Sequence, residues 1–300
     1  MTYQPPRALG MLVGAALTLW ALAIAALLVN HAVAADFGFT VVLTITGAIA
    51  AGALASLFGY WTYALGTLSY ALDRNGLVIH WGATRQVVPL GAIERLVPGT
   101  SVGVPSVRGV SWLGHHVGSA WIERIGDVLF YSTHQAPEQV LYVMTADRNY
   151  AISVADPAGF ARHVQIRQDL GPTARVTHHA KRLGTAAQAF WYDPLGRLLV
   201  GGALLAAFLM WSIVALRYPG LPAAFELHFP AYEDSPLVDV RTKDAIFTLP
   251  KIATGLLVVN LLLGFALHAW ERVAGYAFFI AAAAVQLAFA AAVAIAIQGV

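Results

Sequence analysis

Five apolar stretches, each close to the length of a membrane crossing, constrain the fold of this chain more than any other feature. A helix needs about 20 apolar residues to cross the hydrocarbon core of a bilayer. The 300 residues are 58% hydrophobic and only 11% charged, whereas a soluble domain carries about 25% charged residues. We therefore predict five transmembrane helices, over Leu9–Val29, Thr40–Ala64, Leu198–Leu216, Ile252–Ala269 and Val273–Ile297.

The positions of lysine and arginine predict the orientation, because basic residues concentrate in cytoplasmic segments. Twelve of the 18 Lys and Arg residues lie between Gly66 and Arg197, and none lies in the first loop, residues 31–38. We expect a multi-pass membrane protein with its N-terminus and middle segment cytoplasmic and its C-terminus outside. In one alternative, a signal peptidase cleaves at "AVAAD", residues 32–36, and removes the first span.

Composition also restricts the chemistry. The chain has no cysteine, so disulfides, thiol catalysis and Cys-ligated zinc are excluded. The sequence contains no HExxH or Walker-type signature, and a net charge of +2 does not indicate a nucleic-acid partner. The stretch "GTSVG", residues 99–103, has GxSxG spacing, but it belongs to a Gly/Ser-rich segment and not to the strand-to-helix unit that the motif requires. We therefore predict no catalytic residues, no cofactor and no metal. The expected partners are the lipid bilayer and another protein in the membrane.

The segment between the second and third spans changes to a two-residue alternation, which is typical of strands. The stretch "SYALDRNGLVIHWG", residues 69–82, predicts a hairpin whose turn places Asn75 and Gly76 at positive φ. Asp156 can cap a following helix and Pro157 suits its first position. We expect about seven short strands in a small antiparallel barrel, closed by a helix with one face formed by Phe160, Val164 and Ile166.

These residues resemble a known family. The stretch "YALDRNGLVIHWGATRQVVPLGAIERL" and the later "YAISVADPAGF" are similar to segments of bacterial pleckstrin-homology-like (PH) domains. The resemblance covers residues 68–170 and implies an antiparallel β-barrel capped by a C-terminal helix, which makes the chain an α+β membrane protein. It also implies a location in a bacterial plasma membrane. Because the first hairpin offers only Arg74 and Arg85, we interpret both as solvated surface cations rather than as a lipid-headgroup pocket.

The loop over residues 217–251 resembles a second family. Its matching positions include His228, Asp239 and Lys243, and the similar segment is an extracytoplasmic domain of unknown function found in toxin-immunity-type membrane proteins. We predict that His228, Asp239, Arg241 and Lys243 contact a ligand or partner, and that Asp239 forms a salt bridge with Arg241 or Lys243. A metal site in this loop is the less favoured alternative.

We expect structural rather than functional roles for two polar residues of the last two spans and for two pairs of histidines. Asn260 and Gln286 lie at similar depths in the last two spans, so an interhelical hydrogen bond between them is expected. The pairs His115-His116 and His178-His179 are expected at the surface, because adjacent residues point in different directions and neither pair chelates a metal alone.

The predicted organisation is two spans over residues 1–66, a cytoplasmic PH-like domain over 67–170, a basic interfacial linker over 171–197, a third span over 198–216, an extracytoplasmic loop over 217–251 and a transmembrane hairpin over 252–297. The predicted function is non-catalytic: a scaffold, regulator or accessory subunit. One alternative is a small transporter or an immunity-type sensor that binds an extracellular ligand through the outer loop. Another is a membrane-bound enzyme that uses ungrouped polar residues.

Overall fold

The computed structural model describes residues 1–101, 105–123, 125–134, 137–174, 176–182, 190–191, 193–228 and 238–298. The chain divides into two compact units. The first consists of Met1–Ala23 and Gly52–Leu183, and the second of Ile24–Ala51 and Gly184–Val300. Both boundaries in the N-terminal part fall inside long helices.

The five predicted apolar helices are present and are longer than the sequence predicts, because each continues through the residues that flank its apolar run. At about 1.5 Å per residue, helices of this length exceed the hydrocarbon core of about 30 Å. All five are long and apolar enough to cross a membrane, so the chain is a multi-pass membrane protein with five candidate spans. They are α1 (Ala8–Ala34), α2 (Phe39–Gly66), α5 (Pro194–Arg217), α6 (Thr248–His268) and α7 (Arg272–Gln298).

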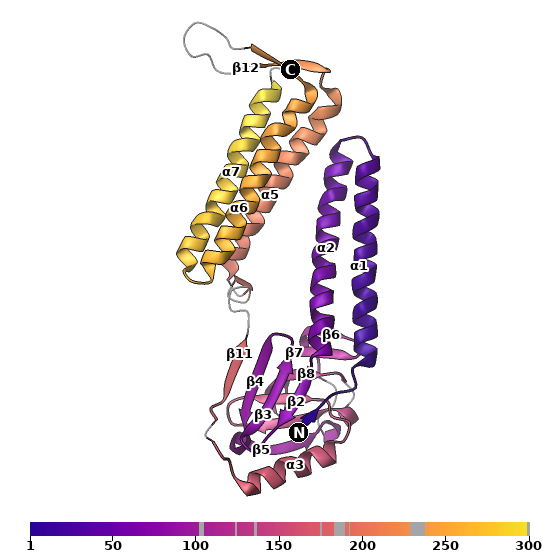
Figure 1. Ribbon diagram of the computed structural model, residues 1–300, viewed down its shortest axis with the longest axis vertical. Coiled ribbons are helices and arrows are strands. Elements are labelled where there is room, and N and C mark those ends of the chain that lie inside the picture. The colour runs from indigo at the N-terminus through magenta and orange to yellow at the C-terminus, as the bar shows by residue number, and fades with distance from the viewer. Residues whose placement is uncertain are drawn as a thin grey trace. The chain divides into compact units, whose positions relative to one another are not determined.

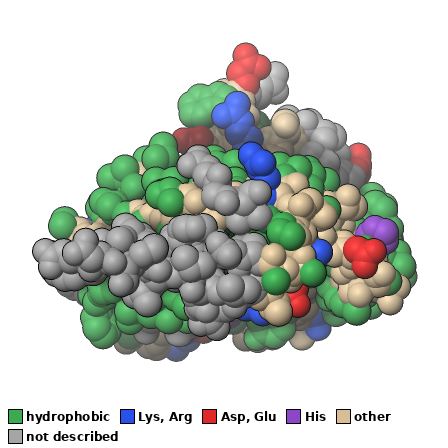
Figure 2. All heavy atoms as spheres, turned by 90° about the horizontal axis from the view of Figure 1, so that it is seen from above, with side chains coloured by type: hydrophobic (Ala, Val, Ile, Leu, Met, Phe, Trp, Pro, Cys, Tyr) green, Lys and Arg blue, Asp and Glu red, His purple; other side chains and the backbone are tan. Residues whose placement is uncertain are grey.

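In the second unit, α5, α6 and α7 lie side by side (Figure 1). Small residues bring these helices close together, since a β-carbon at Gly264 would overlap the ring of Phe279. Close approach of backbones increases the van der Waals packing that helps to drive helix association in lipid. Outward-facing side chains of the helices are apolar, and hydrophobic side chains predominate on the face of the molecule that Figure 2 shows.

The β domain lies in the first unit and consists of two open sheets. One sheet has the order β1-β2-β3-β4-β11 and the other the order β5-β9-β10-β8-β7-β6. The strands are β1 (Thr2–Tyr3), β2 (Ser69–Leu72), β3 (Gly76–Trp81), β4 (Thr84–Pro89), β5 (Ile93–Pro98), β6 (Arg108–Trp112), β7 (His115–Ile122), β8 (Gly126–Ser132), β9 (Leu141–Thr145), β10 (Asn149–Ile152) and β11 (His179–Arg182).

The prediction of a closed antiparallel barrel is therefore wrong. The sheets do not close, and β10 pairs with β8 in the parallel direction, with Asn149 opposite Val128. The tight turn between β9 and β10 places β10 between β9 and β8. The segment from β8 through β9 then acts as the crossover connection that a parallel pair requires.

The first hairpin is confirmed, but its turn differs from the predicted one. Leu72 pairs with Leu77, and the Asp73 N–H donates to the Gly76 carbonyl at 3.1 Å, so the turn residues are Arg74 and Asn75 rather than the predicted Asn75 and Gly76. The carboxylate of Asp73 accepts hydrogen bonds from the backbone N–H groups of Asn75 and Gly76, both at 2.7 Å. This side-chain-to-backbone pattern favours a turn without positive φ at Gly76, and Gly76 is not among the positive-φ glycines.

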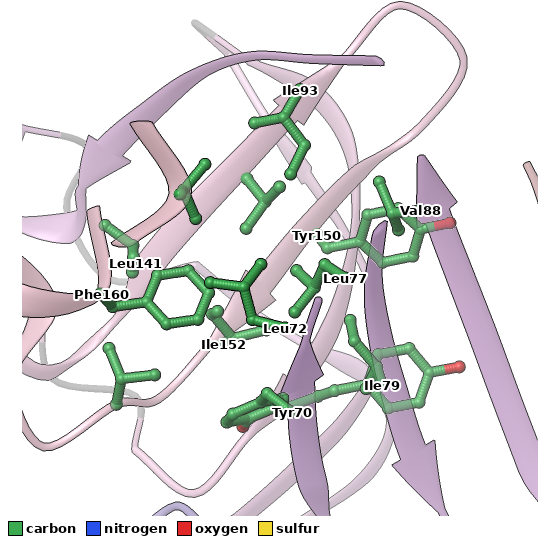
Figure 3. Packing of buried hydrophobic residues seen from close by; sticks show 14 of the residues in the cluster. Tyr70, Leu72, Leu77, Ile79, Val88, Ile93, Leu141, Tyr150, Ile152 and Phe160 are labelled. Atoms are coloured by element: carbon green, nitrogen blue, oxygen red, sulfur yellow. The ribbon is translucent and has the colours of Figure 1, made fainter. Parts of the chain in front are cut away.

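The core lies between the two sheets and α3 (Pro157–Leu170). Figure 3 shows how Leu72, Leu77 and Ile152 converge on Phe160. The predicted cap is confirmed, since Asp156 accepts a hydrogen bond from the backbone N–H of Gly159 at 2.8 Å. Phe160 and Val164 are buried, whereas Ile166 is 48% exposed, so the buried face of α3 is narrower than predicted.

An N-terminal strand that the sequence analysis does not predict completes the first sheet. Strand β1 pairs with β2, with Tyr3 opposite Tyr70, and the N-terminal ammonium donates a hydrogen bond to the Leu72 carbonyl at 3.0 Å. The ring of Tyr3 packs edge-on against Phe160, with centroids 5.0 Å apart. The chain on either side of α1 and α2 therefore contributes to one sheet.

Replacing the cap of α3 tests the role of Asp156. The Asp156→Ala variant leaves the N–H of Gly159 without its acceptor, so we expect it to lower the free energy of unfolding of the β domain by about 1 kcal/mol. Denaturant unfolding of the purified full chain in detergent measures this change. The control Asp169→Ala removes a carboxylate near the other end of α3, and an equal loss in both variants would contradict a capping role.

Candidate functional site

The outer loop forms a short hairpin in the residues that the structure describes. Strands β12 (Ala224–His228) and β13 (Val238–Thr242) pair with His228 opposite Val238 and Asp239 opposite Leu227. Residues 229–237 lie outside the described residues, as do the side chains of His228, Asp239 and Arg241. The contacts predicted for these three residues, including the salt bridge of Asp239, stay predictions.

Lys243 is the one predicted loop residue whose side chain the structure describes. Its ammonium lies over the ring of Tyr218, 4.3 Å from the centroid, and the Tyr218 hydroxyl donates to the Asp244 carboxylate at 2.6 Å. A cation over an aromatic face contributes about 0.5–1 kcal/mol at an exposed site. This contact ties the base of the loop to the end of α5.

Asn260 and Gln286 have separate partners. The amide of Asn260 donates to the Leu256 carbonyl in its own helix at 2.9 Å. The amide of Gln286 crosses from α7 to α6 and donates to the Ala253 carbonyl at 2.7 Å. An interhelical hydrogen bond therefore exists, but it joins Gln286 to the backbone of α6 and not to Asn260, whose amide bonds within its own helix.

The expectation that His115 and His116 lie at the surface is wrong. His115 is fully buried and His116 is 7% exposed. His178 lies between the hydroxyl of Tyr150 at 2.7 Å and the carboxylate of Asp147 at 3.1 Å. The main candidate site lies around the buried His115, where neighbouring residues join the β domain to α1 and α2.

The tip of the β6–β7 hairpin contacts the start of α1. Leu113 and Gly114 form its two-residue turn, and Gly114 has φ +85°. A β-carbon at either Gly10 or Gly114 would overlap the backbone of the other, so only glycine fits this approach. The indole N–H of Trp112 donates to the Gly10 carbonyl at 3.1 Å.

The tip of the β3–β4 hairpin contacts the end of α2 in a similar way. The backbone N–H of Gly82, which has φ +54°, donates to the Thr67 hydroxyl at 2.8 Å. A β-carbon on Gly82 would lie 2.9 Å from the Ala64 side chain, and the Trp81 ring lies 6.5 Å from that of Tyr60. We call the two hairpin tips with these helix ends the helix–hairpin junction.

His115 lies at the centre of the helix–hairpin junction. Its Nε2 accepts a hydrogen bond from the Trp81 indole at 3.1 Å, and its ring meets the edge of Trp112 with centroids 4.4 Å apart. Burial, and to a smaller degree the neighbouring His116, lowers the pKa of His115 to about 4. The imidazole is therefore neutral near pH 7 and acts as an acceptor between two tryptophans.

A second buried polar cluster lies in the other unit, at one end of the three-helix bundle. Asp193 caps α5 by accepting from the Leu195 N–H at 3.1 Å, and it also accepts from the Tyr276 hydroxyl at 2.6 Å. The Nε2 of His268 lies 3.4 Å from the same carboxylate. These contacts link all three helices through one carboxylate. The residues that the structure describes contain no group of three side chains able to hold a metal ion.

Comparison with known proteins gives one match. Residues 68–168 match the family model of the bacterial PH domain. The chain is thus a multi-pass membrane protein that carries a bacterial PH domain between its second and third candidate spans. Searches of curated proteins and of solved structures give no match, and no finding supports the resemblance of the 217–251 loop to toxin-immunity-type proteins.

Adding one methyl group tests the close approach at the helix–hairpin junction. The Gly10→Ala variant would push the β6–β7 hairpin away from α1, so we expect faster hydrogen exchange in Trp112–His115 of the reconstituted full chain. The control Gly52→Ala changes a helical glycine whose β-carbon would meet open space. Unchanged exchange in Gly10→Ala would show that the hairpin does not rest on α1.

The buried imidazole predicts a pH dependence of stability. Between pH 6.5 and about 4 the unfolded chain binds a proton at His115 and the folded domain does not, so stability falls as the pH falls. For a shift of this size the loss is about 3 kcal/mol. Chemical unfolding followed across this pH range should show a shallower dependence in His115→Gln than in the wild type. An equally steep dependence in His115→Gln and in the wild type would contradict this assignment.

Proposed function

We propose that this protein is a non-catalytic scaffold, regulator or accessory subunit of a bacterial plasma membrane. Its N-terminus and PH domain are cytoplasmic, its C-terminus is outside, and its PH domain and outer loop bind protein partners. Orientation follows from the distribution of Lys and Arg. Support for the non-catalytic role comes from the helix–hairpin junction, whose contacts fix the position of a domain rather than assemble reactive groups.

The observation that carries this proposal is the contrast between the two ends of β7. At one end His115 is buried in the junction, and near the other end Trp121 is 72% exposed. The seven residue steps from Gly114 to Trp121 span about 23 Å of extended chain, which places this tryptophan well away from the helix ends. Tryptophan is enriched among residues that dominate protein–protein binding energy.

A second candidate function is a sensor that binds an extracellular ligand through the 217–251 loop. It is favoured by an aromatic cluster at the base of this loop, where the ring of Phe37 lies 5.3 Å from Tyr218 and 4.7 Å from Phe247. A ligand that moved the loop would move these rings, and with them the ends of α5 and α6.

Purification from native membranes in mild detergent distinguishes the two functions. The scaffold predicts a stoichiometric protein partner that is lost in Trp121→Ala, because truncating a central aromatic contact commonly costs more than about 2 kcal/mol of binding energy. The matched control Ile166→Ala removes another exposed apolar side chain of the same domain and should keep the partner. Equal retention in both variants, or a small molecule bound at the loop in place of a partner, would contradict the proposal.

A further inference from the structure

The buried carboxylate of Asp193 lies where the three helices of the second unit meet. The start of α5, the end of α6 and the start of α7 are at the same end of this bundle (Figure 1). Asp193 is 6% exposed, and a buried ionised carboxylate is strongly unfavourable unless a positive charge compensates it. The groups around Asp193 therefore decide whether this site carries a charge.

Two hydrogen bonds satisfy Asp193 without neutralising it. The Tyr276 hydroxyl donates to its carboxylate at 2.6 Å and the Leu195 backbone N–H at 3.1 Å, and both donors are uncharged. The other charged residues that the structure describes at this end of α5, α6 and α7 are exposed and form no described salt bridge with Asp193: Arg197, Glu271 and Arg272. The compensating group is therefore not a lysine or arginine of the described helices.

His268 is the ionisable group that faces this carboxylate. Its Nε2 lies 3.4 Å from the Asp193 carboxylate, and the side chain is buried. Neither ring nitrogen of His268 makes a hydrogen bond with the residues that the structure describes. Apolar rings pack around the imidazole, with the centroids of Phe190 and Phe279 at 5.9 and 6.1 Å. These neighbours hold the imidazole beside the carboxylate.

The net charge of this pair depends on a single proton. An ionised Asp193 beside a neutral His268 leaves one uncompensated negative charge in a buried site. One added proton, on either group, makes the net charge zero, and a second proton makes it positive. Burial favours the state with zero net charge. Because the two groups are 3.4 Å apart, they titrate together as one unit.

We propose that Asp193 and His268 form a proton-binding site that holds one proton while α5, α6 and α7 are packed. Tyr276 is a positioning residue, since its hydroxyl orients the carboxylate. When the pH rises and the proton leaves, the buried carboxylate is uncompensated, so its contacts with α6 and α7 weaken. The site thereby makes the packing of the start of α5 depend on pH. This goes beyond the proposed function, because it requires neither a protein partner nor a ligand of the outer loop.

This pH dependence has the opposite sign to that of His115. The stabilisation that the proton-binding site contributes is present when the proton is bound and is lost as the pH rises. The contribution of His115 is lost as the pH falls below 6.5. Measurements between about pH 6.5 and 9 therefore separate the two effects.

Solid-state NMR of the full chain in bilayers reads both groups directly. Histidine is labelled with ¹⁵N and the aspartate carboxyl with ¹³C, and the signals are assigned by their loss in His268→Gln and Asp193→Asn. We expect one proton on the pair at about pH 6 and its loss in one step, with the same midpoint for both nuclei, as the pH rises to about 9. An ionised Asp193 beside a neutral His268 at about pH 6, two unrelated midpoints, or no step at all would overturn the inference.

Two variants and a matched control test how the site works. Tyr276→Phe removes a donor that favours the ionised carboxylate, so the midpoint should rise by about one pH unit. Asp193→Asn keeps an acceptor for the Leu195 N–H but removes the charge, so the unfolding temperature of the full chain should depend less on pH. The control Glu271→Gln removes an exposed carboxylate at the same helix ends and should keep the wild-type profile. An unchanged midpoint in Tyr276→Phe, or equal profiles in Asp193→Asn and the control, would contradict the proposal.

Discussion

The contact between Gly10 and Gly114 is the interaction on which the first unit of this protein depends. Two backbones meet there without a β-carbon between them, and the Trp112 indole fixes the same spot through the Gly10 carbonyl. A water-soluble domain joined to a membrane helix by one flexible linker would be free to rotate. Here two hairpin tips rest on two helix ends, so the orientation of the domain follows from packing as well as from connectivity.

Three buried polar side chains each form a hydrogen bond to another element of the structure. A buried group that lacks a hydrogen-bond partner costs about 1–3 kcal/mol, and in lipid there is no water to compensate. The Gln286 amide donates to a carbonyl of the facing helix, Asp193 accepts from the Tyr276 hydroxyl, and His115 Nε2 accepts from an indole. Among the described residues, Oε1 of Gln286 and Nδ1 of His115 have no hydrogen-bond partner. Each of the three bonds joins two different elements, so it also fixes how those elements pack.

Local signals predicted local structure well. The apolar runs predicted all five helices, the stretch over residues 69–82 predicted a hairpin that is present, and Asp156 caps α3 as expected. Contacts between residues distant in the sequence could not be predicted from these local patterns. The residues next to His115 in the sequence do not indicate that Trp81, 34 residues earlier, and Trp112, three residues earlier, pack around its ring. The parallel pairing of β8 with β10 likewise depends on contacts between distant parts of the chain. The approach of Gly82 and Gly114 to the helix ends is equally non-local, because it joins residues that are 15 or more positions apart in the sequence.

The N-terminal strand has a consequence for biogenesis. Strand β1 is made before the first two membrane helices and β2 directly after them, yet the two pair in one sheet. Both helices must therefore enter the bilayer as a loop, with their flanking chain kept in one compartment, before that sheet can be completed.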